Sequence, residues 1–269
     1  AFALAQTSLP EAAMHGDIAT VHALLQAGAD PNALGDFDTP ALHWLVRVNE
    51  PALVNELLQA GANPNLLSGL GVSPLSLAIA NSNAELVTLL LAAGADPHQT
   101  EPSGETLLMS AAALGDVTIV AALLDKELDV NERDSHYGQT ALMFASRAGH
   151  AAVVQLLLQH GANPNLTTSI GPTPAFVAPN SVPGFGFGVG IIRGGVPADR
   201  GRREPTPGGL SALHYAARHD HVAVAKLLLA AGAELNAREA NDIWPLLMAI
   251  SNNNMAMAHY LLEQPGVLI

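Results

Sequence analysis

Cysteine is absent from all 269 residues, which excludes disulfides, thiolate metal ligands and a cysteine nucleophile. Aromatic residues make up only 4% of the chain and charged residues only 13%, whereas 49% of the residues are hydrophobic. A chain of this composition can bury a large core and does not belong to the disordered class. Because aromatic residues are scarce, alanine, leucine and valine must build the core, which suits closely packed helices.

Basic residues are also few, with 11 Lys and Arg against 24 Asp and Glu and a formal net charge of −13. This negative charge argues against nonspecific binding of nucleic acid and against docking on an anionic membrane surface. No apolar run reaches the roughly 20 residues that a membrane-spanning helix needs. We therefore expect neither a nucleic-acid partner nor a membrane span.

Signatures of catalysis are missing as well. Neither Gly-x-Ser-x-Gly nor His-Glu-x-x-His occurs, and the glycine-rich run 184–190 lacks the Lys-Ser/Thr pair of a phosphate-binding loop. His214, His219 and His221 are close in sequence, but spacings of five and two do not place them on one helical face. We expect no enzymatic activity, no cofactor and no metal site.

What the chain does contain is a unit of about 33 residues that recurs along nearly its whole length. A complete copy spans residues 138–165, GQTALMFASRAGHAAVVQLLLQHGANPN. Thr140 fits the N-cap of a first helix, Gly149 marks a turn, and Gly161 supplies the left-handed backbone that ends a second helix. One such unit cannot bury its own apolar face, so neighbouring units must stack.

The end of the second helix recurs at regular positions along the chain. These positions are Gly28, Gly61, Gly94, Glu127, Gly161, Gly232 and, loosely, Pro265. Glu127 occupies a position where glycine is expected. It should lower the folding stability by about 1 kcal/mol if its backbone is left-handed. At the start of the chain, Ser8 followed by Glu11 predicts a capping box.

The repeated text is similar to T-P-L-H-x-A-A-x-x-G-H-x-x-V-V-x-L-L-L-x-x-G-A-D-x-N, the pattern of the ankyrin-repeat family. Residues 211–221, SALHYAARHDH, and residues 140–150, TALMFASRAGH, match it closely. The resemblance covers nearly everything outside one insertion, and the Ala/Leu-rich, lysine-poor composition is typical of a bacterial member. It implies an all-α solenoid of about seven helix-turn-helix repeats with short β-hairpin fingers, whose first helices and fingers form a concave face.

The resemblance also assigns structural roles to four histidines. His43 and His214 occupy the histidine position of the first helix, and His150 and His221 occupy the Gly-His turn. In the family, the first-helix side chain satisfies backbone groups between repeats. We therefore expect these four rings to stabilise the repeats and not to bind a ligand.

An insertion rich in Gly, Pro and Arg, residues 166–209, interrupts the finger between repeats five and six of a single solenoid spanning 1–269. Four of the 11 Lys and Arg residues lie within it, interleaved with apolar residues. In one interpretation its Phe and Ile side chains anchor a partner while its arginines meet carboxylates. In another it folds back over its own concave face, and in a third it is disordered.

Positions late in the first helices should face the same side as the fingers. Among them, Arg147, Arg218 and His219 flank the insertion, and Tyr137 lies on the preceding finger tip. The predicted partner-binding residues are Arg147, Arg218, His219, Phe185, Phe187, Ile191, Arg193, Arg200, Arg202, Arg203 and Tyr137.

These observations favour a non-enzymatic protein–protein interaction scaffold or accessory subunit that binds a protein partner through its concave face and extended finger loop. One alternative is a regulatory or targeting module of a longer enzyme chain. Another is a structural protein or larger complex that self-assembles end to end through residues 267–269. The opening AFALAQ reads like the tail of a secretory signal, which predicts a periplasmic or extracellular location; a trimmed start and a cytoplasmic location are the alternative.

Overall fold

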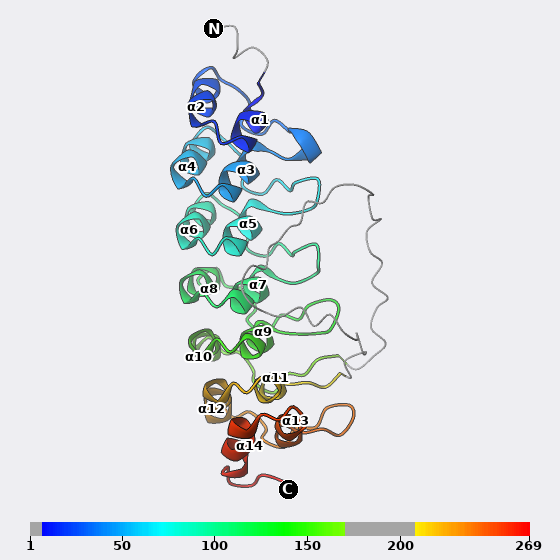
Figure 1. Ribbon diagram of the computed structural model, residues 1–269. Coiled ribbons are helices and arrows are strands. Elements are labelled where there is room, and N and C mark those ends of the chain that lie inside the picture. The colour runs from blue at the N-terminus through cyan, green and yellow to red at the C-terminus, as the bar shows by residue number, and fades with distance from the viewer. Residues whose placement is uncertain (1–6, 170–207) are drawn as a thin grey trace. The chain divides into compact units, whose positions relative to one another are not determined.

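The computed structural model describes residues 7–169 and 208–269 of the chain. Fourteen α-helices lie in these ranges and pair into seven helix-turn-helix repeats, as the sequence predicts (Figure 1). The chain divides into two compact units. Unit 1 comprises residues 1–107 and 125–128, and unit 2 comprises residues 108–124 and 129–269.

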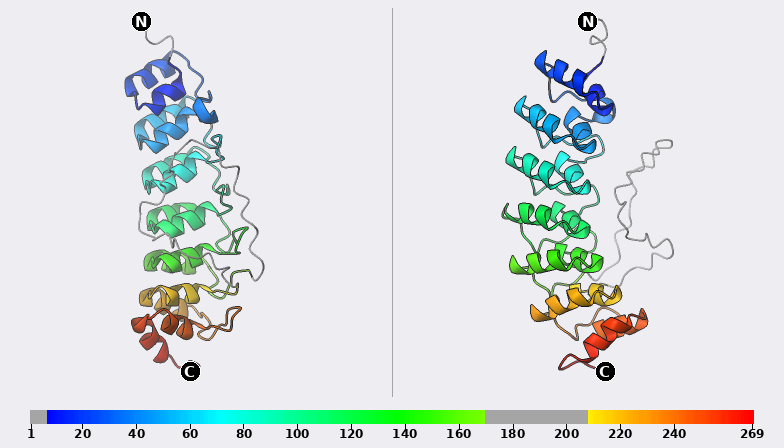
Figure 2. Two further views of the ribbon diagram at one scale, coloured as in Figure 1. Left: turned by 45° about the vertical axis from the view of Figure 1, so that its right-hand side comes forward. Right: turned by 60° about the vertical axis from the view of Figure 1, so that its left-hand side comes forward.

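Unit 1 contains three helix pairs. They are α1 (Leu9–Met14) with α2 (Ile18–Gln26), α3 (Ala41–Arg47) with α4 (Pro51–Gln59), and α5 (Pro74–Ala80) with α6 (Ala84–Ala92). The first helices pack in one row, α1 on α3 and α3 on α5, and α4 packs on α6 in a second row (Figure 2). A short 3₁₀ helix, η1 (Asp36–Asp38), lies in the first finger. The N-cap Ser8 and Glu11 form the predicted capping box at the start of α1.

Unit 2 contains the remaining four pairs, except for Leu107, the first residue of α7, which belongs to unit 1. They are α7 (Leu107–Leu114) with α8 (Val117–Leu124), α9 (Ala141–Ala148) with α10 (Ala151–Gln159), α11 (Ala212–Arg218) with α12 (Val222–Ala230), and α13 (Pro245–Ser251) with α14 (Met255–Leu262). Helix α11 packs between α9 and α13, and the second helices stack in the order α8, α10, α12, α14. No helix in the described ranges is long and apolar enough to cross a membrane.

Small residues of the first helices and branched residues of the second helices build the core. Ala145 on α9 and Ala216 on α11 are completely buried, which lets the two helices approach closely. Val153, Val154 and Leu157 form the buried face of α10, as the repeat pattern predicts. Each repeat thus buries its apolar face against its neighbours, as expected for stacked units.

The second helices end in left-handed backbone at the predicted glycines. The φ angle is +87° at Gly94 and +88° at Gly161. Glu127 adopts the same conformation with a φ of +57°, although it carries a side chain. In the last repeat the left-handed residue is Gly266, with a φ of +85°, and the loose assignment to Pro265 was wrong because a longer turn follows α14.

In five of the repeats the closing asparagine forms a clamp to the next repeat, and the third repeat has His98 at this position. The Asn165 side chain donates to the Gly232 carbonyl at 3.0 Å and accepts from the Glu234 N–H at 2.8 Å. The same two bonds recur at Asn32, Asn65, Asn131 and Asn236. This clamp explains why the sequence repeats asparagine after the helix-ending glycine, a role that the sequence analysis did not assign.

The fingers connect each second helix to the next first helix. Where the sequence predicts β-hairpins, the described residues hold isolated bridges, Leu34 with Pro40, Thr100 with Thr106 and Thr167 with Ser211. Neighbouring fingers are joined by single backbone bonds. These run from Gly69 N to Phe37 O (3.1 Å), from Ser169 N to Tyr137 O (2.7 Å) and from Ala240 N to Gly208 O (3.0 Å).

The insertion leaves the fold from the base of a finger. Beside the bridge between Thr167 and Ser211, the N–H of Thr168 donates to the Leu210 carbonyl at 3.0 Å, and the N–H of Gly209 donates to the Thr168 carbonyl at 2.9 Å. These residues form a stem that ties together the two ends of the segment 170–207, which lies outside the described residues. The stem belongs to unit 2, between α10 and α11.

Candidate partner-binding site

Three first helices carry an arginine three residues after an aromatic residue, so that both side chains lie on one helical face. The pairs are Trp44 with Arg47 on α3, Phe144 with Arg147 on α9, and Tyr215 with Arg218 on α11. The Cζ atom of Arg47 lies 5.1 Å from the centroid of the Trp44 ring. The corresponding distance from Arg147 to Phe144 is 4.8 Å. Both distances are typical of cation–π contacts, which hold the guanidinium groups over apolar surface.

Two of these arginines meet around Tyr215 in unit 2. Helices α9 and α11 pack together, and the positive charges of Arg147 and Arg218 both act on the Tyr215 hydroxyl. Burial nevertheless raises the pKa of Tyr215, so its hydroxyl stays neutral. That hydroxyl accepts a 2.5 Å hydrogen bond from Nε2 of the buried Gln139. Within the described ranges, neither arginine forms an ion pair with a carboxylate.

His219 belongs to the same cluster. Partial burial, followed by the charges of Arg218, His221 and Arg147, lowers the pKa of its imidazole. The ring is therefore neutral at pH 7, and the arginines supply the positive charge of the site. The structure thus brings together three predicted site residues, Arg147, Arg218 and His219.

The turn after Arg147 is fixed by a neighbouring histidine. His221 Nε2 donates to the Arg147 carbonyl at 3.1 Å. The ring lies against Gly149, where an added Cβ would sit 2.6 Å from Cε1 of His221. Gly149 also has a φ of +80°, so this position requires glycine for both its backbone and its close contact.

The structural roles predicted for four histidines are confirmed, because each ring is bonded to a backbone carbonyl of an adjacent repeat. His43 bonds to Val72 O (2.9 Å), His214 to Ile243 O (3.1 Å), His150 to Ala113 O (3.0 Å) and His221 to Arg147 O (3.1 Å). In the part of the chain that the structure describes, no group of three His, Asp or Glu side chains could hold a metal ion.

Tyr137 lies on the finger that precedes α9 and is 45% exposed. The buried carboxylate of Asp134 accepts bonds from the N–H groups of His136 (2.8 Å) and Tyr137 (2.6 Å), which fixes the finger tip. The Tyr137 carbonyl in turn accepts from Ser169 in the stem of the insertion. Tyr137 is therefore a surface residue next to the insertion, as the sequence predicts.

The other predicted site residues belong to the insertion. Phe185, Phe187, Ile191, Arg193, Arg200, Arg202 and Arg203 lie outside the described residues. Conversely, the sequence analysis missed Phe144, Tyr215 and Gln139, which support the arginine pair. The sequences FASR and YAAR recur at the same repeat position, and this spacing of an aromatic residue and an arginine could have identified Phe144 and Tyr215.

Comparison with known proteins places these repeats in a family. Models described as ankyrin repeats in three copies match residues 9–101 and 75–168, and one described as ankyrin repeats in many copies matches residues 210–262. The fold is similar to the human ASB11 ankyrin repeat domain, with 22% identity, a TM-score of 0.72 and coverage of 98% of this chain and 100% of that one.

It is also similar to the ankyrin repeat domain of Bcl-3, described as a unique member of the IkappaB family. That domain is 24% identical with a TM-score of 0.69, and the match covers 96% of this chain and 99% of that one. No curated protein matches the sequence. Because the family models cover well over half of its residues, the chain belongs to the ankyrin-repeat family.

Proposed function

We propose that this chain is a non-catalytic scaffold or accessory subunit that binds a protein partner through the first-helix face of unit 2. Ankyrin repeats are protein–protein interaction modules, which supports the general class. The observation that carries the proposal is the pair Arg147 and Arg218. Both guanidinium groups lie beside Tyr215 and form no ion pair within the described residues.

The chemistry of the pair favours an acidic partner surface. Guanidinium groups bind carboxylates through two parallel hydrogen bonds, and arginine, tyrosine and tryptophan dominate the binding energy of interfaces. Phe144 holds Arg147 in a cation–π contact on a helix, which reduces the side-chain entropy that this arginine loses on binding. Two such groups are unusual in a chain with a net charge of −13.

The insertion at residues 166–209 extends the same recognition surface in this proposal. Its stem between Thr167 and Ser211 joins α10 to α11, the helix that carries Arg218. Phe185, Phe187 and Ile191 would supply apolar anchors, and the arginines of the insertion would orient the partner. A periplasmic or extracellular location stays a prediction from the opening residues.

The proposal is tested by partner capture from the native source with the tagged full chain. Replacing Arg147 and Arg218 together by alanine should reduce capture by more than tenfold, since each hot-spot arginine contributes about 2 kcal/mol. Deleting residues 184–201 should do the same while leaving the helical circular dichroism intact.

Arg238→Ala is the matched control, because Arg238 lies on another finger of unit 2 and pairs with Asp242 at 2.9 Å. It should retain full capture. Proteins captured equally by the double variant and by the unmodified chain would show that this face does not bind the partner.

A further inference from the structure

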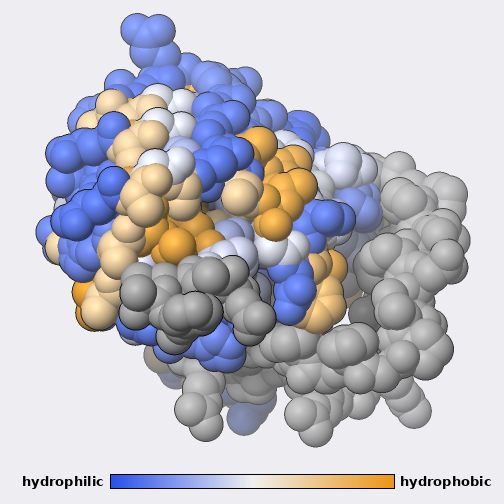
Figure 3. Space-filling view, turned by 90° about the horizontal axis from the view of Figure 1, so that it is seen from above, coloured by the Kyte–Doolittle hydropathy of each residue, from blue (hydrophilic) through white to orange (hydrophobic). Residues whose placement is uncertain are grey.

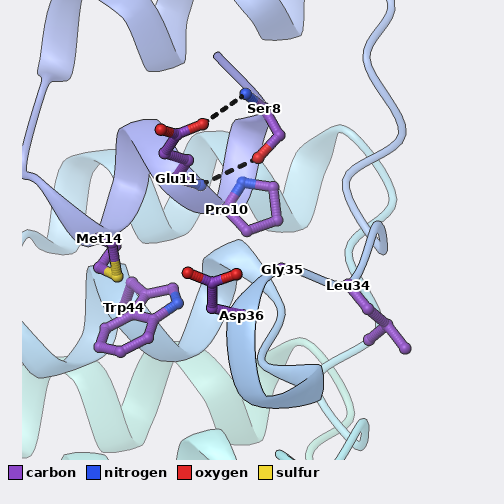
Figure 4. Close-up of a pocket in the computed structure, with 8 residues that line it drawn as sticks. All are labelled: Ser8, Pro10, Glu11, Met14, Leu34, Gly35, Asp36 and Trp44. Atoms are coloured by element: carbon purple, nitrogen blue, oxygen red, sulfur yellow. Dashed lines mark hydrogen bonds between the residues drawn. The ribbon is translucent and has the colours of Figure 1, made fainter. Parts of the chain in front are cut away.

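A cleft of about 450 Å³ opens in unit 1 between α1, α3 and the first finger (Figure 4). Its lining residues are Ser8, Pro10, Glu11, Met14, Leu34, Gly35, Asp36 and Trp44. None of them belongs to the partner-binding site proposed above. The cleft therefore offers an independent place for a ligand.

The polar side-chain groups of the cleft are two carboxylates, one indole N–H and the Ser8 hydroxyl. Glu11 and Asp36 contribute the carboxylates, and no lysine or arginine lines the cleft. Trp44 is only 9% exposed, and Figure 4 shows its indole nitrogen on the side that faces Asp36. This Nε1–H forms no hydrogen bond to another described residue, and its nitrogen is open to the cleft. It can therefore donate to a ligand that brings an acceptor into the cleft.

The walls of the cleft are held in place by local contacts. Gly35 lets the finger lie directly on α1, because an added Cβ there would sit 2.5 Å from Cβ of Pro10. Glu11 uses only Oε2 in its capping-box bond to the Ser8 N–H. The Arg47 guanidinium stacks on Trp44 and restricts the position of the indole ring. The cleft is thus formed before any ligand arrives.

The surroundings are acidic and partly apolar. Unit 1 holds 13 acidic residues and two basic ones, a formal net charge of −11. Leu34 and Phe37 on the same finger are 58% and 50% exposed. A cation with an apolar stem satisfies both features, whereas a bare metal ion would meet the Trp44 N–H dipole, which repels positive charge. Arginine and lysine side chains have the required shape and charge.

We propose that this cleft binds a basic segment of a second protein. One arginine or lysine side chain lies between the carboxylates of Glu11 and Asp36, with its stem against Met14 and Pro10. A main-chain carbonyl of the same segment accepts a hydrogen bond from Trp44 Nε1. The charge complementarity with unit 1 selects a basic segment over an acidic one.

The test uses nuclear magnetic resonance of the ¹⁵N-labelled full chain, because its two tryptophans give two indole N–H signals. Trp44 reports on the cleft, and Trp244 in unit 2 is the internal control; Trp244→Phe assigns the signals. The probe is a capped peptide of alternating glycine and arginine at millimolar concentration. The matched peptide carries citrulline, which has the shape of arginine without its charge.

The arginine peptide should shift the Trp44 signal saturably and leave the Trp244 signal unchanged, and the citrulline peptide should bind at least tenfold more weakly. Asp36→Asn should weaken binding by about tenfold, the effect of about 1.4 kcal/mol. Glu85→Gln removes one charge from α6, outside the cleft, and should change affinity by less than about twofold. Equal shifts with citrulline, unchanged affinity in Asp36→Asn, no saturable shift, or the same shift with Mg²⁺ alone would each overturn the proposal.

Discussion

Units 1 and 2 share one scaffold but differ sharply in charge. Unit 1 has 13 acidic and two basic residues, a net charge of −11, whereas unit 2 has 11 acidic and nine basic residues, a net charge of −2. Both use the same asparagine clamps and the same left-handed helix ends. The comparison shows that the packing of the repeats does not constrain the charge of the surface residues. Each unit can therefore bind a partner of different charge. Figure 3 views the end of unit 1 that carries α1 and α2, where hydrophobic residues show among hydrophilic ones.

The units also differ in the hydrogen bonds of the buried histidine that occupies the same repeat position in each. In unit 2, Nδ1 of His214 is bonded to the N–H and the hydroxyl of Ser211, at 3.1 and 2.8 Å. In unit 1, Nδ1 of His43 is buried without a hydrogen-bond partner among the described residues. Pro40 occupies the N-cap there and has neither an N–H nor a hydroxyl. The equivalent ring is therefore better satisfied in unit 2.

The largest effect that tests this difference is expected from removing each ring. His214→Ala should lower the free energy of unfolding by about 3 kcal/mol and His43→Ala by about 2 kcal/mol, because only the first leaves a hydrogen-bonded Nδ1 partner unsatisfied. Urea unfolding followed by tryptophan fluorescence measures both, since Trp44 reports on unit 1 and Trp244 on unit 2. Equal losses would remove the distinction between the two sites.

A smaller effect should come from protonating the same rings. Burial lowers the pKa of His43 and His214 below the ordinary value of 6.5, against the effect of their backbone bonds. Below pH 6.5 the unfolded chain then binds more protons than the folded chain, so the free energy of unfolding should fall as the pH decreases towards the folded pKa values. Urea titrations between pH 7 and about pH 5 measure this. The slope should be shallower in a variant that lacks both rings, and an unchanged slope would assign the pH dependence to other groups.

The smallest effect concerns the left-handed residue that follows α8, which belongs to unit 1 although the helix belongs to unit 2. Gly28, Gly61 and Gly94 end their helices with left-handed backbone, whereas Glu127 adopts the same conformation at a φ of +57°. Glu127→Gly should raise the free energy of unfolding by up to about 1 kcal/mol, because glycine adopts this backbone without strain. Gly94→Ala is the reverse control and should lower it by a similar amount. A destabilised Glu127→Gly variant would mean that the glutamate side chain stabilises the folded state by more than the backbone strain destabilises it.

The repeat register could be predicted from the sequence because its signals are local. Thr140, Gly149 and Gly161 each act on the backbone at their own position, through an N-cap or a left-handed turn. The arginine pair could also be predicted, since Arg147 and Arg218 occupy the same position in consecutive repeats. Equal positions in stacked repeats lie side by side.

The cleft of unit 1 could not be predicted in the same way. It depends on Gly35 lying against Pro10 and on Trp44 turning its N–H toward Asp36, and these residues belong to three different segments. The sequence shows Trp44 only as a large residue where smaller ones are usual. Whether such a residue fills a core or lines a cavity is decided by the path of the finger, which no local pattern encodes.

The bridge between Thr167 and Ser211 has a consequence for how this protein can change over generations. Closing the 38 residues of segment 170–207 costs only about 2 kcal/mol more chain entropy than closing four. The stem aligns α10 and α11 independently of the sequence inserted between its two sides. It is therefore a site at which insertions are tolerated. Peptides of unrelated sequence and length can be exchanged there, by evolution or by grafting, while the helices on either side keep their places.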